Sequence, residues 1–382
     1  MGYHLSKIDE HIARFYAKPL FQSALLGESQ LCVWFPASGK STVSRDIASS
    51  KKLQKEALGM LYGRIKLIFI NCLETQNATS EEIIKQISKR LKTPEDSEDT
   101  IGKISQKCKI LIENGQEILI IIDAIDELSE DERKSLLLNL SKIVQINKRR
   151  IHTVINTVNK FAIEKTALEN PSVFALLNKI IFMPVISGSL LYQYLDHHEK
   201  AFGVKLNPNK KKEIEVRTGG ILFLTREIIR SSGDDGQLEL KLQSIWNRLP
   251  PFYKDVLKKY YLGKRLDTKE DKVYNEIQKL GIGKMAIFKE KLALLEKDTD
   301  SLLKQLLTQK EKEIFTYFKK NKGRLVPKDR IASILWRNKV DELYSDWAID
   351  KTISRLREKL IMAGFGNDCL ITLKGKGYRW LL

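Results

Sequence analysis

The first 190 residues alternate short, continuously apolar segments with segments of helical periodicity. A strand that is apolar along its whole length must be covered on both faces, which is typical of parallel sheets. Alternation of such strands with helices indicates an α/β domain. The sequence therefore predicts a domain over residues 1–190, with a parallel sheet and helices on both faces. Its expected strands lie within residues 31–35, 64–72, 117–128, 149–157 and 178–185.

Two changes of pattern divide the rest of the chain. From residue 191 the segments are helical and strongly charged, interrupted by the polar run SSGDDGQ (231–237) and by Pro250-Pro251. Such runs and proline pairs mark breaks between elements. We expect a helical lid and connector over residues 191–305 and a separate compact domain over residues 306–382.

The net charge of +18 and the pI near 9.5 favour an anionic partner. The alternative is a lysine-rich composition that solvates the whole surface. The four cysteines have no metal-ligand spacing. No stretch approaches 18 uncharged apolar residues, and the first residues lack the apolar core of a signal peptide. We therefore expect no membrane partner and a cytoplasmic, nucleoid-associated location.

The run PASGKST follows an apolar strand and opens a helical segment, which is the context of a phosphate-binding loop. Lys40 is expected to reach the β- and γ-phosphates, and the Ser41 hydroxyl to bind Mg²⁺. Trp34 stands where a Walker A motif has its first glycine. Because tryptophan lacks glycine's freedom at positive φ, we expect an altered opening turn and weakened binding. The predicted nucleotide-binding residues are Pro36, Ala37, Ser38, Gly39, Lys40, Ser41 and Thr42.

Acids follow the apolar strand near residue 120, at the end where open α/β sheets bind ligands. Asp123 is the expected second Mg²⁺ residue. Asp126 and Glu127 are expected to orient or deprotonate the attacking water. The alternative is a strand that merely ends in a solvated acidic turn.

The segment IIIDAIDE (120–127) resembles the Walker B motif of STAND-class ATPases, the signalling relatives of AAA+ proteins that include NACHT proteins. Asn156 falls where that class has its sensor-1 residue. Gly219-Gly220 resembles the glycine motif of its lid, although Leu222 stands near the place of the usual proline. The resemblance implies a P-loop NTPase that binds ATP, hydrolyses it slowly and works as a switch, with Asn156 in a catalytic role.

The last 76 residues predict three helices and a hairpin. Thr308 and Glu311 have the spacing of a capping box, and a second helix is expected over residues 328–336. A third, over residues 345–360, has an apolar stripe on one face and cationic and hydroxyl side chains on the other. A final hairpin has the tip KGKG (374–377). This order predicts a winged helix-turn-helix.

The third helix and the hairpin tip are the expected contacts to double-stranded DNA. Residues 307–382 contain 17 lysines and arginines against 9 acids, which suits a phosphate backbone. A protein-interaction module with a solvated basic face is the alternative. Trp347 could contact a base or, alternatively, pack within the domain. Arg357 could bind a phosphate or, alternatively, pair with an acidic side chain. The predicted DNA-binding residues are Trp347, Lys351, Ser354, Arg355, Arg357, Lys374 and Lys376.

The same segment resembles the OmpR/PhoB-type effector domain of response regulators over about 75 residues. The chain shows no acidic receiver domain, so control by a phosphorelay is not expected. The matching residues are Leu307-Thr308, Glu311, Asn321, Gly323-Arg324, Trp336, Ile349-Asp350, Ile353 to Arg357, Lys359-Leu360, Ile371-Thr372 and Lys374 to Arg379.

Together these features predict a DNA-binding transcriptional regulator whose winged helix is controlled by an ATP-binding switch. Nucleotide state would change how the lid packs, and so expose the winged helices or pair them in a self-associated form. One alternative is an ATPase in signalling or defence that is only tethered to DNA. Another is a degenerate scaffold that does not hydrolyse ATP, which Trp34 motivates.

Overall fold

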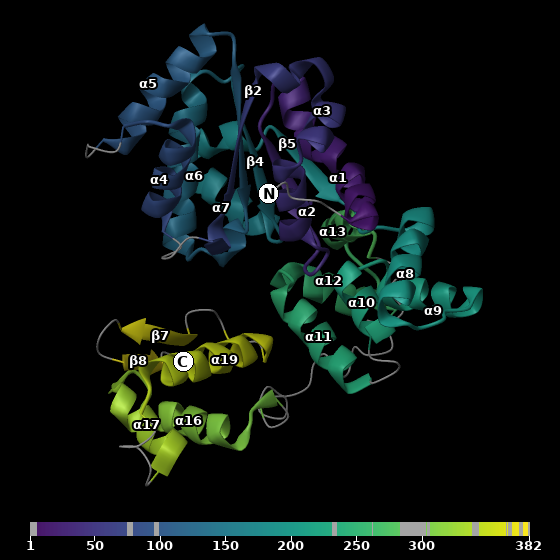
Figure 1. Ribbon diagram of the computed structural model, residues 1–382, viewed down its shortest axis with the longest axis vertical. Coiled ribbons are helices and arrows are strands. Elements are labelled where there is room, and N and C mark those ends of the chain that lie inside the picture. Colours follow the sequence, from purple (N-terminus) through teal and green to yellow (C-terminus); the bar gives the residue numbers. More distant parts are fainter. Residues whose placement is uncertain are drawn as a thin grey trace. The chain divides into compact units, whose positions relative to one another are not determined.

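The computed structural model divides into two compact units (Figure 1). The first contains residues 1–233 and 249–289, and the second contains residues 234–248 and 290–382. The expected lid and connector is therefore shared between the units. The structure describes residues 6–74, 79–94, 99–230, 235–261, 263–282, 303, 306–337, 344–363, 365, 369–373 and 377–380, with backbone alone for 235–240, 361 and 362.

The first unit is built on a five-stranded sheet in the order β2-β3-β4-β1-β5, with every pair parallel. All residues of β1 and β4 are buried, as are all of β3 except Glu117. This burial explains the continuously apolar runs and confirms the predicted parallel sheet. The strands are β1 (Gln30–Trp34), β2 (Ile65–Asn71), β3 (Glu117–Asp123), β4 (Ile151–Thr157) and β5 (Lys179–Met183).

Helices cover both faces of this sheet. One face packs against α4 (Ser80–Leu91), α5 (Thr100–Glu113) and α6 (Glu130–Ile146). The other packs against α1 (Lys7–Leu26) and α2 (Lys40–Ser49), and α3 (Lys51–Leu58) packs on these two helices. Helix α7 (Lys160–Glu169) follows β4, and the short helices are η1 (Gly59–Arg64), η2 (Cys72–Glu74), η3 (Ile125–Glu127) and η4 (Pro171–Leu176).

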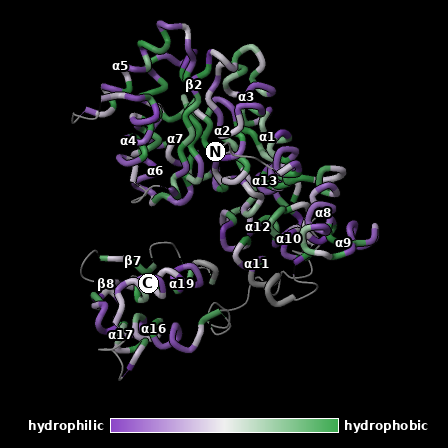
Figure 2. The backbone as a smooth tube through the Cα atoms, viewed as in Figure 1, coloured by the Kyte–Doolittle hydropathy of each residue, from purple (hydrophilic) through white to green (hydrophobic). Residues whose placement is uncertain are grey.

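Apolar residues gather on the strands and on the inner faces of the helices (Figure 2). This pattern is expected where burial of apolar surface drives folding. Among the described helices, none has both the length and the apolar composition needed to cross a membrane.

A helical part completes the first unit. It contains α8 (Gly188–Phe202), α9 (Pro208–Thr218), α10 (Leu222–Arg230), α12 (Pro251–Tyr261) and α13 (Thr268–Lys279). Helix α10 packs on α8 and α9, and α12 packs on α13. The backbone N–H of Val185, after β5, donates to Leu280 O at 3.1 Å, and Lys160 Nζ lies 2.6 Å from Glu276 Oε1 on α13. These contacts fix α13 against the carboxyl edge of the sheet.

The second unit contains a three-stranded antiparallel sheet in the order β6-β8-β7. The capping box at the start of its α16 is formed as predicted, because Thr308 Oγ1 accepts from Glu311 N and Glu311 Oε2 accepts from Thr308 N. Its elements are α11 (Asp235–Arg248), α16 (Gln309–Lys320), β6 (Leu325–Val326), α17 (Lys328–Trp336), α19 (Asp346–Met362), β7 (Leu370–Leu373) and β8 (Gly377–Trp380).

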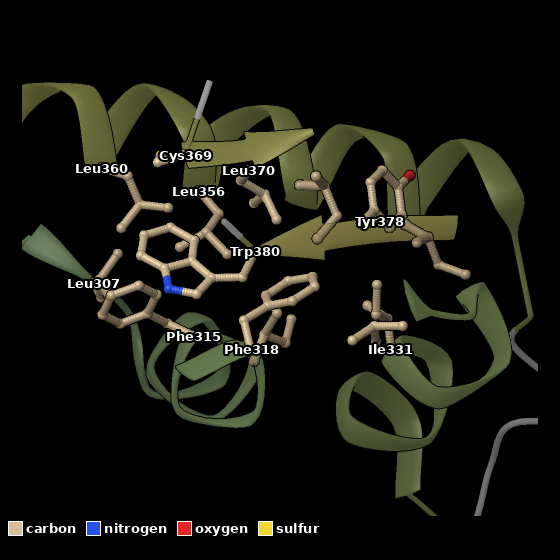
Figure 3. Packing of buried hydrophobic residues seen from close by; sticks show 14 of the residues in the cluster. Leu307, Phe315, Phe318, Ile331, Leu356, Leu360, Cys369, Leu370, Tyr378 and Trp380 are labelled. Atoms are coloured by element: carbon tan, nitrogen blue, oxygen red, sulfur yellow. The ribbon is translucent and has the colours of Figure 1, made fainter. Parts of the chain in front are cut away.

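One apolar core holds the second unit together (Figure 3). Leu356 and Leu360 from α19 point toward Trp380 of β8, and Phe315 of α16 contacts the Trp380 ring edge-on at 5.2 Å. The predicted stripe on α19 is therefore its buried face. Three helices around a strand hairpin confirm the winged helix-turn-helix. Helix α11 also belongs to this unit and contacts α19.

Candidate functional site

The parallel sheet brings the predicted nucleotide residues to one edge. In the register of neighbouring strands, Cys32 of β1 pairs with Asn156 of β4, and Asn71 of β2 pairs with Asp123 of β3. The loop before α2 and the acids after β3 therefore lie at the same carboxyl edge, where such sheets bind ligands.

The loop between β1 and α2 has the backbone of an anion cradle. Gly39 is the N-cap of α2 at φ 89°, and Ala37 lies in the left-handed region at φ 64°. Pro36 and Ala37 form a turn, Ser38 is buried, and Lys40, Ser41 and Thr42 begin the helix. Left-handed residues before a helix turn successive N–H groups toward one point, where the helix dipole also attracts an anion.

Trp34, at the position of the first Walker A glycine, lies before the loop rather than in it. It is the last residue of β1, and its φ is not positive. The left-handed positions of this loop are Ala37 and Gly39, and the expectation that Trp34 alters the opening turn and weakens binding stays a prediction. The Trp34 indole is 1% exposed and turns into the sheet edge.

Lys40 lies between the two aspartates predicted from the Walker B resemblance. Its Nζ is 3.4 Å from Asp126 Oδ2 and 3.7 Å from Asp123 Oδ1. Asp123 is fully buried, so its carboxylate can act only on groups within this edge. The structure brings the loop lysine and both acids together, and this cluster is the candidate nucleotide site.

Asp126 is held by the turn that follows β4. Its Oδ1 accepts from Thr157 Oγ1 at 2.5 Å and from Asn159 N at 3.3 Å, and its Oδ2 accepts from Val158 N at 2.8 Å. These donors fix the carboxylate in one orientation. Glu127, the next acid, is half-buried in η3.

Asn156 is buried at the sheet edge and bonded within the protein. It is fully buried, and its Nδ2 donates to Ser44 Oγ at 3.0 Å and to Asp123 Oδ1 at 3.3 Å. Its Oδ1 accepts from Trp34 Nε1 at 3.0 Å. The amide thus joins β1, α2 and β3.

The donor set fits a nucleotide-bound Mg²⁺. Asp123 Oδ2 and Ser38 Oγ are buried without a hydrogen-bond partner. A buried carboxylate oxygen without a partner is costly, and a hydrated cation would satisfy it. Among the described residues, no group of three or more His, Cys, Asp and Glu side chains is arranged to hold a metal ion by itself. Mg²⁺ commonly uses one or two protein ligands with phosphates and waters, as Ser41 and Asp123 would provide.

A cavity of about 450 Å³ adjoins the loop, and sequence reasoning missed its walls. Asp9 comes from α1, Tyr194 and His198 from α8, and Arg226 from α10. The His198 ring contacts the Tyr194 ring at 4.3 Å, and burial lowers the pKa of His198. The His197-His198 pair was visible in the sequence, but nothing there connected it to the loop.

Helix α10, in the expected lid, also reaches the loop between β1 and α2 directly. A Cβ built on Gly39 would lie 3.1 Å from Leu222 Cδ1, at the start of α10. Leu222, which stands near the place of the usual lid proline, therefore packs over the loop. A lid in contact with the loop can respond to what the loop binds.

In the second unit, α19 presents the predicted face to solvent. Trp347, Lys351, Ser354 and Arg355 are all exposed, whereas the opposite stripe forms the core. Trp347 is 69% exposed, and Lys351 Nζ lies over its ring, 4.4 Å from the centroid. Packing into the core is therefore not the role of Trp347.

Arg357 lies between α19 and the hairpin. Its Nε donates to Leu370 O at 2.9 Å, and its Nη2 donates to Thr372 Oγ1 at 3.0 Å. These bonds fix β7 against the helix, and among the described residues no acid forms an ion pair with this guanidinium. Lys374 and Lys376, the predicted hairpin contacts, lie outside the described residues.

A second set of polar contacts, centred on Asp350, orients the same helix. Lys328, at the start of α17, lies 2.9 Å from Asp350 Oδ1, and the Tyr378 hydroxyl donates to the same carboxylate. These bonds hold the pKa of Asp350 below its usual value despite the opposing effect of burial. Together with the bonds of Arg357 to β7, these contacts fix α17, β7 and β8 to α19.

Two family models match parts of the chain. Residues 304–380 match the C-terminal domain of transcriptional regulatory proteins, so the second unit carries a DNA-binding domain of that type. Residues 63–157 match the N-terminal region of nephrocystin 3. The comparison with curated proteins gives no match.

Several solved structures have a similar arrangement at low identity. The Aeropyrum pernix ORC1 protein in complex with DNA is 16% identical, with a TM-score of 0.42 over 98% of this chain and 88% of that one. The ADP form of the Aeropyrum pernix ORC2 protein is 13% identical, with a TM-score of 0.43 over 94% and 96%. A Walker-type ATPase of Pyrococcus abyssi is 13% identical, with a TM-score of 0.42 over 70% and 89%.

Proposed function

We propose that this protein is a transcriptional regulator whose winged helix binds duplex DNA under the control of an ATP-binding, STAND-like switch. The observation that carries the proposal is the division of α19 into two faces. Ile349 and Leu356 are buried in the core, while Lys351 and Arg355 are exposed. As a protein that binds duplex DNA, it would be located at the nucleoid.

The exposed face of α19 suits the major groove. The groove admits one helix, and cationic and hydroxyl side chains can reach base edges and phosphates there. Lys351, Ser354 and Arg355 are assigned to these contacts. Trp347 lies one turn before Lys351 and offers an aromatic surface to a thymine methyl group. Arg357 is assigned to holding the hairpin beside the groove, because two of its nitrogens bond to β7.

The first unit supplies the switch. The loop around Gly39 binds the phosphates of ATP, Lys40 neutralises the β- and γ-phosphates, and Ser41 and Asp123 hold the Mg²⁺. When bound, Mg²⁺ supplies charge neutralisation at the phosphates. Asp126 and Glu127, which follow β3 at the same edge, are assigned to orienting or deprotonating the attacking water.

The cavity beside the loop accommodates the nucleoside. It lies next to Gly39 and Thr42 and has Tyr194, His198 and Arg226 in its walls. An aromatic surface and a small number of polar groups are the usual lining of a small-molecule site. Because α8 and α10 contribute these side chains, a bound nucleotide would contact the lid as well as the loop.

Helix α11 supports control of one unit by the other. In the chain it lies between the lid helices α10 and α12, yet it packs with the winged helix and contacts α19. A change in the lid would therefore be passed along the chain to an element that touches the DNA-reading helix. Such a switch requires two arrangements that the nucleotide distinguishes.

The DNA-binding face is tested with a duplex that the protein selects from a random pool. Lys351→Ala with Arg355→Ala should weaken binding at least about tenfold and reduce the salt dependence of the affinity. A charge-matched control, Lys312→Ala with Lys320→Ala, changes α16 and should have a much smaller effect. Fluorescence anisotropy at several salt concentrations measures both. Equal losses in the two double variants would contradict the assigned face.

A further inference from the structure

Trp34 occupies the position where a Walker A motif has its first glycine, yet it is buried at the centre of the nucleotide edge. Its indole Nε1 donates to Asn156 Oδ1 at 3.0 Å. Tyr16 of α1 packs against the indole with ring centroids 4.9 Å apart, and the Tyr16 hydroxyl donates to Pro184 O at 2.6 Å. The large side chain is therefore held in one position from both sides.

The indole determines which way the Asn156 amide points. An indole nitrogen can only donate a hydrogen bond, so the oxygen end of the amide must face Trp34. The NH₂ end must then face Ser44 and Asp123, where it donates at 3.0 and 3.3 Å. A flipped amide would set its oxygen against the Asp123 carboxylate, with no donor between them. Only the observed orientation satisfies all of these groups.

The fixed amide in turn distinguishes the two oxygens of Asp123. Oδ1 accepts from Asn156 and lies 3.7 Å from Lys40 Nζ, whereas Oδ2 is buried without a partner. Both N–H groups of Asn156 have acceptors within the protein. Asn156 is thus engaged with the acid rather than with a ligand beyond it.

We propose that Trp34 is a positioning residue that, through Asn156, aligns Asp123 for the nucleotide-bound Mg²⁺. The proposal rests on the nucleotide site described under the proposed function. It reverses the expectation that Trp34 marks a degenerate loop, and it assigns Asn156 to the orientation of Asp123. It predicts that loss of the indole N–H weakens the response to Mg²⁺ more than nucleotide binding itself.

The test measures binding of a fluorescent ATP analogue to the full chain as Mg²⁺ is titrated, and again in EDTA. Trp34→Phe keeps an aromatic ring and removes the N–H. We expect the Mg²⁺ concentration for half-maximal binding to rise about tenfold, while the affinity in EDTA stays within about twofold. Tyr16→Phe removes a hydroxyl from the same cluster without touching the Trp34–Asn156 bond, and its Mg²⁺ midpoint should match that of the unmodified chain.

Asn156→Ala tests the same link from its other end and keeps the proposal testable if Trp34→Phe does not fold, as judged by its melting curve. Asn156→Ala should raise the Mg²⁺ midpoint similarly. Adding Trp34→Phe to it should then have little further effect, because the indole acts through the amide. The proposal is overturned if either variant leaves the Mg²⁺ midpoint unchanged, or lowers affinity equally with and without Mg²⁺. If the unmodified chain binds no nucleotide under any condition, the nucleotide half of the proposed function fails, and this inference fails with it.

Discussion

His152 is a titratable side chain buried in the middle layer of the first unit. It lies on β4 opposite Leu119 and is 1% exposed. Burial lowers the pKa of His152 to about 4 and outweighs a backbone hydrogen bond at Arg149, which favours the charged form. Desolvation dominates because burial disfavours the charged form of the ring.

This burial makes stability depend on pH. An unfolded chain binds a proton at His152 below pH 6.5, while the folded chain keeps the ring neutral down to about pH 4. The neutral ring's contribution to the free energy of unfolding is therefore fully present above pH 6.5 and is lost as the pH decreases. Between pH 6.5 and 5 we expect a loss of about 2 kcal/mol from this group. Urea unfolding at pH 6.5 and pH 5 should show this loss of stability. In the His152→Gln variant, the part of the pH dependence that comes from His152 should be absent. An identical pH dependence in the two proteins would contradict it.

Among the elements, the turn between α9 and α10 depends most clearly on glycine. Gly220 has φ 85°, and a Cβ built on it would lie 1.8 Å from Ile186 O, in the segment between β5 and α8. This turn sets the start of α10, where Leu222 packs over the phosphate loop. A side chain at Gly220 would force the lid helix away from the sheet edge.

Gly220→Ala should therefore lower the stability of the first unit by at least about 3 kcal/mol, the range of severe backbone and steric defects. Gly203→Ala is the matched control, because Gly203 has φ 67° but an added Cβ would meet nothing within 4 Å. It should cost only about 1–2 kcal/mol, the usual penalty for left-handed backbone. Urea unfolding compares the two. Similar losses would mean that backbone conformation, rather than contact with Ile186, makes the glycine necessary.

The elements also show which features a sequence can predict. The strands and the helical segments between them follow from local periodicity, because burial of one face or of a whole strand imposes a regular apolar pattern. The loop around Lys40 was predictable because its chemistry is contained in consecutive residues. The walls of the cavity were not, since Asp9, His198 and Arg226 come from helices that only the tertiary fold brings together. The bond from Trp34 to Asn156 was not predictable for the same reason, because the two residues are 122 positions apart in the sequence.

At the scale of the whole molecule, the basic character has more than one source. The net charge of +18 exceeds the surplus in residues 307–382, where 17 cations face 9 acids. Much of the positive charge therefore lies in the first unit, on surfaces remote from α19 in the sequence. Such charge raises the rate and the nonspecific part of DNA association without adding specificity.

If the nucleotide unit controls the winged helix, the two binding equilibria must be coupled. ATP with Mg²⁺ should then change the affinity for a selected duplex, and couplings of this kind typically reach about 5- to 150-fold. The same duplex must change the affinity for ATP by the same factor, because the coupling free energy is shared. Lys40→Ala, which removes the proposed phosphate contact, should abolish the effect of ATP on DNA affinity measured by anisotropy. Should the unmodified chain bind both ligands while each leaves the other's affinity unchanged, the units act independently. The protein would then be an ATP-binding module tethered to DNA, because reciprocal coupling is what separates a switch from a fusion of two working parts.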